Sequence, residues 1–220
     1  KRPFAAGQLS VAQGLWAAAL MATASVACGS FLPPMFLMFL AIYYFLSITY
    51  SFWIKKMVLL DVFALAGLYT LRILAGQGAT GIECSNWLLG FSMFLFLSLA
   101  LLKRYIELER VDLMGQKSAW GRGYFTSDLS VLLSLGQLSG WLAVLVLALY
   151  IDSENVRLLY HHPARLLLAC PPLLYWISRI WLLATRERLH DDPVVFVLKD
   201  WVSYVIGMLI LLFIWFASIS

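Results

Sequence analysis

Residues 130–151 read SVLLSLGQLSGWLAVLVLALYI, a run of 22 residues without a charged side chain. A helix of about 20 apolar residues crosses a hydrocarbon layer of about 30 Å, so this run predicts a transmembrane helix. Lipid offers the backbone no hydrogen-bond partners, so spanning segments form helices or closed barrels, and this run lacks the alternation of a barrel strand. Six further stretches are also mostly apolar and of similar length: 9–28, 33–53, 58–78, 86–103, 164–184 and 195–219. The sequence therefore predicts an all-α integral membrane protein with seven spans.

The composition and the distribution of charge agree with a protein whose solvent is the lipid bilayer. Apolar residues make up 62% of the chain and charged residues 13%. The formal net charge of +4 comes from Lys and Arg gathered on alternate loops, which is the positive-inside pattern and not a nucleic-acid surface. We expect the loops near residue 55, at 103–128 and at 185–196 to face the cytoplasm, with Ser220 on the opposite side and no nucleic-acid partner.

Two features of the sequence leave alternatives open. Cys28 and Cys84 both fall near the outer face, where they either form a disulfide or pack as small apolar residues, and packing is the favoured interpretation. The oligomeric state is also left open by the sequence.

The third apolar stretch carries two ionisable residues. Asp61 lies at its beginning and Arg72 lies well inside it. Eleven residues are about three helical turns, so both side chains fall on nearly the same face, about 16 Å apart. A guanidinium inside a membrane is costly and usually faces the bundle interior with a partner. Two interpretations of Arg72 stay level: a phosphate-binding group, and a structural arginine held by carbonyls or a neighbouring helix.

Two loops on the predicted cytoplasmic side concentrate polar residues. Lys103, Glu107 and Arg110 are spaced i, i+4 and i+7 and so share one helical face. This face is either a solvated helix end or a cluster that holds a metal-bound diphosphate, since carboxylates suit Mg²⁺ and cations suit phosphate. In the second loop Asp191 and Asp192 are adjacent. They are either part of the same cluster or caps of the following helix, whose first turn contains a proline.

Several motifs resemble those of the UbiA superfamily of intramembrane prenyltransferases and occur along the chain in the same order as in that superfamily. The stretch KRYIEL at 103–108 resembles what polyprenyl-phosphate phosphoribosyltransferases carry in place of the second aspartate-rich motif of that superfamily. The stretch HDDPVV at 190–195 resembles bacterial members that carry a haloacid-dehalogenase-like domain ahead of the membrane part. The remaining motifs are KRPFAAG at 1–7, YSFWIKK at 50–56, Asp61, and LRILAG at 71–76.

The resemblance implies a fold of nine transmembrane helices around a central cavity, of which this chain would supply the third to the ninth. Residues 1–220 would then form a single transmembrane domain. The superfamily's first motif, of the form N-D-x-x-D-x-x-x-D, would lie before Lys1. We therefore expect the chain to be truncated at its N-terminus and inactive alone. We also expect the bacterial inner membrane as its location, with the active-site loops in the cytoplasm.

The resemblance also implies a Mg²⁺-dependent transfer in which a diphosphate leaves. We expect Lys103, Glu107 and Asp191 to line one cytoplasmic pocket with Arg72 at its floor, and Glu107 and Asp191 to be metal ligands. The residues expected to be catalytic are Asp61, Lys103, Glu107, Asp191 and Asp192. Those expected to contact substrate or phosphate are Lys1, Arg2, Tyr50, Lys55, Arg72, Arg104 and Tyr124.

The favoured reaction is phosphoribosyl transfer from a diphosphate-bearing donor to a polyprenyl phosphate lipid. Prenyl transfer to an aromatic acceptor is the first alternative. The aromatic branch of the superfamily usually has the second motif D-x-x-x-D, which is replaced here by Lys103-Arg104-Tyr105-x-Glu107. A transporter or a non-enzymatic scaffold is the second alternative. A transporter should show internal repeats, which this sequence lacks, and a scaffold has no need of clustered acids. Mg²⁺-dependent binding of a diphosphate would separate the enzyme from these classes, whereas the donor, the acceptor and the tail length stay open.

Overall fold

The computed structural model describes residues 10–118, 122–153, 156, 160–189 and 192–218. Within these ranges the chain forms helices and turns, with one isolated antiparallel bridge between Ser118 and Phe125. The helices are α1 (Val11–Gly29), α2 (Pro34–Phe52), α3 (Leu60–Thr80), α4 (Asn86–Leu113), α5 (Leu129–Ile151), α7 (Cys170–Thr185), α8 (Pro193–Lys199) and α9 (Trp201–Ser218). Short 3₁₀ segments are η1 (Ile54–Lys56), η2 (Thr126–Asp128) and η3 (Pro163–Ala169).

Seven of the described helical segments are long and apolar enough to cross a membrane, so the all-α integral membrane fold predicted from the sequence is confirmed. Many large apolar side chains on their outer faces are exposed, for example Trp16 at 78% and Leu211 at 66%. In a bilayer such side chains face lipid tails, which are as apolar as they are. Their exposure therefore costs none of the hydrophobic free energy that exposure to water would cost.

Local sequence explains where several helices begin and end. Ser10 forms a capping box with Gln13 at the start of α1, and the Ser85 hydroxyl accepts a hydrogen bond from the Leu88 amide at the start of α4. Gly81 ends α3 with φ of 72°, a conformation that glycine adopts without steric cost. These signals fix the short connections, so consecutive helices run antiparallel.

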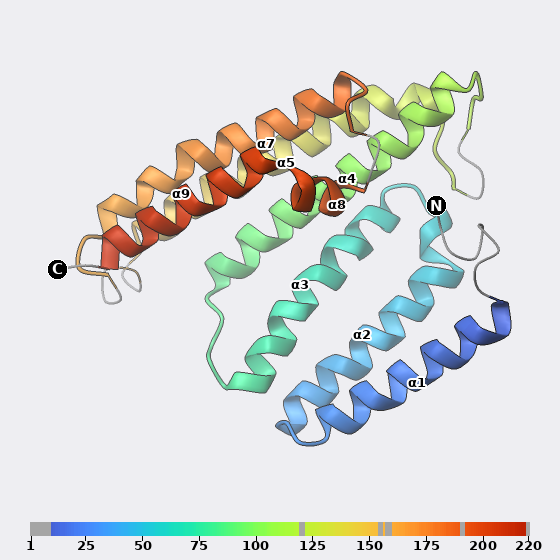
Figure 1. Ribbon diagram of the computed structural model, residues 1–220, viewed down its shortest axis with the longest axis horizontal. Helices are drawn as coiled ribbons and strands as arrows, with labels where there is room; N and C mark the ends of the chain where they lie inside the picture. The colour runs from blue at the N-terminus through green and yellow to red at the C-terminus, as the bar shows by residue number, and fades with distance from the viewer. Residues whose placement is uncertain (1–9, 119–121, 154–155, 157–159, 190–191, 219–220) are drawn as a thin grey trace.

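Helices α1, α2, α3 and α4 lie side by side in the order of the chain, and α5, α7 and α9 are grouped beyond α4, as Figure 1 shows. Each of α1, α2, α3, α4, α5, α7 and α9 contacts the next one. The short helix α8 departs from this order because it contacts both α9 and α4. It therefore brings the last connection of the chain to the polar end of α4.

The spans differ from the sequence prediction in three places. Helix α4 continues beyond the predicted span 86–103 to Leu113, and it carries the face 103–110, which the sequence predicted to be helical, as part of the same helix. The stretch 164–184 begins as the 3₁₀ segment η3 before α7. The last stretch, 195–219, is not one continuous helix: it is interrupted at Asp200, whose carboxylate accepts hydrogen bonds from the amide and the hydroxyl of Ser203 and so caps α9.

The three cysteines are free, so Cys28 and Cys84 do not form a disulfide.

Helices α4, α5 and α7 pack closely around Trp181. Its indole is 2% exposed, and its Nε1–H donates to the hydroxyl of Ser98 at 3.1 Å. That hydroxyl donates in turn to the carbonyl of Gly136 at 2.7 Å. A Cβ at Gly136 would stand 2.1 Å from the Trp181 ring, so only glycine lets the ring lie against α5.

We expect Gly136→Ala to lower the free energy of unfolding by about 1–3 kcal/mol, because the added methyl overfills this contact. The measurement is the unfolding midpoint of the purified protein in detergent. The matched control is Gly67→Ala on α3, where a Cβ meets no atom within 4 Å. Equal stability of the two variants would contradict the packing described here.

Candidate functional site

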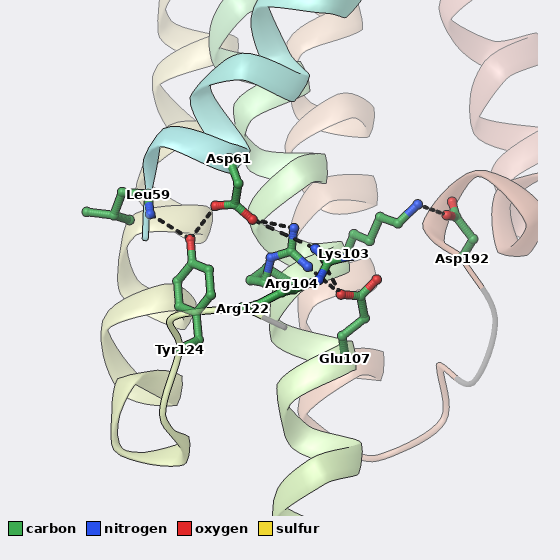
Figure 2. A network of polar contacts seen from close by, with 8 residues as sticks. All are labelled: Leu59, Asp61, Lys103, Arg104, Glu107, Arg122, Tyr124 and Asp192. Carbon is green, nitrogen blue, oxygen red and sulfur yellow. Dashed lines mark hydrogen bonds and ion pairs between the residues drawn. The ribbon is translucent and has the colours of Figure 1, made fainter. Parts of the chain in front are cut away.

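The polar centre of the molecule is an ion pair between Arg104 on α4 and Asp61 in the first turn of α3. The Arg104 side chain is 1% exposed and that of Asp61 0% exposed. Both groups would be costly to bury alone, since an unpaired ion must give up its hydration. The pairing therefore fixes α3 against α4 at this end of the bundle (Figure 2).

Tyr124 connects this ion pair to the α2–α3 connection. Its hydroxyl donates to Asp61 Oδ1 at 2.6 Å and accepts the amide of Leu59 at 2.8 Å. Leu59 has φ of 65°, a region that a side chain with a Cβ rarely adopts. Such strained residues persist where surrounding contacts hold them, and Tyr124 supplies one of those contacts.

Glu107 and Arg122 extend the network toward solvent. Glu107 lies one turn after Arg104 on α4, and its carboxylate pairs with the Arg104 guanidinium. Arg122 Nη1 lies 3.4 Å from Glu107 Oε2 and 3.8 Å from Asp61 Oδ2. The side chains of Glu107 and Arg122 are 29% and 24% exposed, so the network opens to water on this side.

The segment that carries Arg122 and Tyr124 is held close to the α2–α3 connection by Gly123. A Cβ at Gly123 would stand 2.8 Å from a Val58 methyl and 3.3 Å from the Lys56 carbonyl oxygen. A glycine between two functional side chains therefore lets the backbone approach closely enough for both to reach Asp61.

The network is electrically balanced. Two carboxylates, Asp61 and Glu107, meet two guanidinium groups, Arg104 and Arg122. The Arg104 guanidinium also lies 5.6 Å from the centroid of the Tyr124 ring. Burial, and then the hydrogen bond to the Asp61 carboxylate, raises the pKa of Tyr124 above its ordinary value of 10.0. Tyr124 is therefore a neutral hydrogen-bond donor at physiological pH.

Lys103 lies beside Arg104 on α4 but points to the other side, as Figure 2 shows. Its ammonium pairs with the carboxylate of Asp192, directly before α8. The pair closes a cavity of about 80 Å³ between α3, α4 and the start of α8. The lining is apolar apart from the ion pair: Leu65, Tyr69, Phe96, Leu99, Ala100, Lys103, Asp192 and Pro193.

Arg72 lies away from this cavity, so it does not form the expected floor. It lines a groove of about 400 Å³ with Tyr43 and other residues of α2 and α3, and it donates to the Tyr43 hydroxyl at 2.6 Å. The Arg72 guanidinium stands 4.9 Å from the centroid of the Tyr69 ring, and Tyr69 also lines the cavity. One aromatic ring therefore lies between Arg72 and the cavity.

The structure brings together most of the described residues that the sequence singled out. Tyr50, near the end of α2, lies within electrostatic reach of Arg104 and Asp61. Lys55 lies in η1 at the same end of the bundle. Asp61 is fully buried and is bound to Arg104 and Tyr124, and its expected catalytic role stays a prediction. Lys1, Arg2 and Asp191 lie outside the described residues.

Sequence reasoning missed two polar contacts. Arg122 was not singled out, although its place between Gly121 and Gly123 is the kind of signal that marks a close backbone approach. The second is the pair of Arg179 on α7 with Asp200, whose distances are 2.7 and 3.0 Å. Nothing in their separation along the chain predicts that pair.

The roles of Glu107 and Asp191 as Mg²⁺ ligands stay predictions, and Asp191 lies outside the described residues. Among the described residues, no group of three or more His, Cys, Asp or Glu is placed to hold a metal ion. Glu107, an expected metal ligand, has its carboxylate bound by two guanidinium groups.

Comparison with known proteins finds relatives along nearly the whole chain. It is 39% identical over 210 residues to uncharacterized protein y4nM of Sinorhizobium fredii, which covers 95% of this chain and 41% of that protein. It is 32% identical over 207 residues to nodulation protein NoeC of Azorhizobium caulinodans, 93% of this chain and 66% of that protein. No protein-family model matches the chain.

A further match is to decaprenyl-phosphate phosphoribosyltransferase of Mycolicibacterium smegmatis, 30% identical over 127 residues, 58% of this chain and 40% of that enzyme. The chain is a distant homologue of that transferase. The match agrees in part with the resemblance inferred from the short motifs. The chain spans less than two thirds of the length of each of these three relatives.

We expect removal of one member of the buried ion pair to cost about 3–5 kcal/mol of unfolding free energy, because the other buried charge loses its buried counter-charge. Asp61→Asn and Arg104→Met test this in detergent unfolding. The double variant should lose less than the sum of the two. Asp112→Asn, an exposed carboxylate on the same helix, is the control and should change the unfolding free energy by no more than about 0.5 kcal/mol. Strict additivity of the two single changes would contradict a direct interaction.

We expect Tyr124→Phe to lower the unfolding free energy by about 1–3 kcal/mol below pH 10, because the Leu59 amide and the Asp61 carboxylate lose a partner. The folded-state pKa of Tyr124 lies above the unfolded value, so its contribution is fully present below about pH 10 and is lost as pH rises through the folded pKa. Unfolding measured from pH 8 to 11.5 should therefore show wild type and variant converging at the alkaline end. A constant difference across that range would contradict the raised pKa.

Proposed function

We propose that this chain is the membrane part of a UbiA-type transferase that acts on a polyprenyl phosphate, and that its reaction is phosphoribosyl transfer. The observation that carries the proposal is the placement of Lys103: a cation at the mouth of an apolar cavity, beside a balanced and rigid polar network. The distant homology to decaprenyl-phosphate phosphoribosyltransferase supports the same class.

The proposed chemistry needs one bond to form and one to break. A phosphate oxygen of the lipid attacks the anomeric carbon of phosphoribosyl diphosphate, the carbon–oxygen bond to the diphosphate breaks, and diphosphate leaves with the electron pair. The phosphate is already ionised, so no proton has to be removed from the nucleophile. The site has to hold negative charge on both reactants and keep a long apolar chain out of water.

Each described part of the site has a role in this proposal. Lys103 would bind a phosphate oxyanion at the mouth of the cavity, because an ammonium is a point charge that suits phosphate. The apolar lining around Leu65, Phe96 and Leu99 would receive the first part of the lipid tail. Arg122 and Glu107, which are partly exposed, would face the water-soluble donor. Arg104 and Asp61 would hold α3 and α4 in place without touching a substrate.

Mg²⁺ enters this proposal only as the ion that accompanies a donor diphosphate. Asp191, which lies outside the described residues, is a candidate ligand for it on this chain. We also propose the bacterial inner membrane as the location, with the Lys103 end of the bundle facing the cytoplasm, where a soluble sugar diphosphate would be found.

The test is transfer by the full-length protein in lipid nanodiscs with Mg²⁺. One reaction receives a labelled polyprenyl phosphate with phosphoribosyl diphosphate, and a parallel one receives a labelled prenyl diphosphate with an aromatic acid. We expect a phosphoribosylated lipid in the first. Lys103→Met should lower its rate on the order of 10²-fold, the usual effect of removing one group that stabilises developing charge.

The control is Lys56→Met, which removes an exposed cation of η1 at the same end of the bundle and should leave the rate within about twofold. A prenylated aromatic product would replace the proposed substrate while keeping the class. Absence of product in both reactions, together with absence of diphosphate binding, would reject the enzyme and favour a transporter or scaffold.

A further inference from the structure

Lys103 and Arg104 are neighbours on α4 but differ in how firmly they are held. Arg104 is 1% exposed and pairs with Asp61, which is 0% exposed. Lys103 is 41% exposed and pairs with Asp192, which is 34% exposed. An ion pair that is open to water contributes little to stability, and its members exchange partners readily. A buried pair exchanges much less readily, because each buried charge would lose its most deeply buried partner.

The Lys103–Asp192 pair fastens one end of α8. This helix of seven residues reaches from α9 to α4 (Figure 1), with Asp192 directly before its first residue, Pro193. At its other end Asp200 separates α8 from α9 and is gripped by Arg179 of α7 through two hydrogen bonds, at 2.7 and 3.0 Å. The end at Asp200 is therefore anchored to two long helices, and the end at Asp192 is held to α4 by an exposed ion pair.

The cavity beneath this ion pair is too small for a lipid substrate as it stands. Its volume is about 80 Å³, whereas ligand pockets typically have about 300–1,000 Å³. Asp192 and Pro193 are part of its wall. Movement of the first residues of α8 away from α4 would enlarge the cavity and expose Lys103, with the α3 and α4 walls unchanged.

We propose that Asp192 occupies on Lys103 the position that a phosphate oxyanion of the substrate takes, and that this contact keeps α8 closed over the cavity until the phosphate displaces it. This inference rests on the proposed function for the identity of the displacing anion. Once the phosphate is bound, its charge repels the Asp192 carboxylate, and α8 turns outward about Asp200. A phosphate carries more negative charge than a carboxylate and so competes well for one ammonium group.

This arrangement makes closure and binding mutually exclusive. A ligand shifts a two-state equilibrium only when it interacts differently with the two states, and here the phosphate binds Lys103 only when Asp192 has left it. An Asp192 that merely capped α8 would be indifferent to the ligand. An Asp192 that bound the substrate or its metal would make binding tighter, not weaker. The three roles therefore predict different signs for one substitution.

The experiment uses the full-length protein in nanodiscs with four variants: wild type, Asp192→Asn, Lys103→Met and the control Asp112→Asn. Amide hydrogen exchange of residues 194–199, without ligand, reports how firmly α8 is closed. Binding of farnesyl phosphate, a soluble prenyl phosphate, is measured on the same samples. Farnesol tests whether the phosphate is needed, and inorganic diphosphate separates a lipid phosphate from a free one.

We expect Asp192→Asn and Lys103→Met both to speed exchange of α8, because either change removes the ion pair. Their effects on binding should be opposite. Asp192→Asn should bind farnesyl phosphate about 2- to 5-fold more tightly, since the competing carboxylate is gone, and Lys103→Met should bind it more weakly. Asp112→Asn should match wild type in both measurements. Farnesyl phosphate should itself speed exchange of α8 in wild type, and farnesol should not.

Two results would overturn the inference: unchanged exchange of α8 in Asp192→Asn, or weaker binding in that variant. A different result would be binding of diphosphate but not of farnesyl phosphate, tighter in Asp192→Asn and weaker in Lys103→Met. In that case a phosphate still displaces Asp192 from Lys103, but the phosphate belongs to the donor and not to the lipid. Failure of the proposed function has a separate signature. The exchange and binding results would hold as expected while no transfer product formed, so the ion pair would control access to a phosphate site of another reaction.

Discussion

The burial of one guanidinium group is the constraint on which the rest of the polar structure depends. Arg104 lies on α4 within a bundle of mostly apolar helices, and its side chain is only 1% exposed. A charge in such a place must be paired and hydrogen-bonded, or the helices cannot pack there. Asp61 therefore has to stand at the start of α3, opposite Arg104, and this requirement sets the register of α3 against α4.

The remaining features of that end of the bundle follow from the position of Asp61. The chain must turn sharply to begin α3 there, and Leu59 accordingly adopts φ of 65°. The strained amide of Leu59 needs an acceptor, which is the hydroxyl of Tyr124. Gly123 lets the backbone come near enough for that contact, and Arg122 then reaches the same carboxylate from the side. The segment 122–124, which is distant in sequence from Asp61, is thus held in place by its contacts with Asp61 and Leu59.

The seven spans could be predicted from the sequence because the signal adds up over many residues. Each span has about 20 positions, and the transfer preference of any one matters little to the sum. Single polar contacts have no such redundancy. The interruption at Asp200 was missed because it depends on Arg179, which comes from another helix, and on Ser203, whose hydroxyl could equally have bonded within its own helix. Arg72 was placed near the wrong cavity because its partner Tyr43 lies on α2, and helical periodicity says nothing about that neighbour.

For the same reason, the residues that are easiest to predict at the site are the least informative about substrate. Arg104 and Asp61 stand out in the sequence as charges near apolar spans, and the structure shows that they hold helices together. Loss of activity after their substitution would follow from loss of packing whatever the reaction, and it would be the same in a relative with another substrate. Lys103 and Asp192 are partly exposed and can be changed at little cost in stability. If the proposed function is correct, substrate recognition depends on the exposed ion pair and on the cavity that it lines, whereas the buried pair supports the packing of the helices.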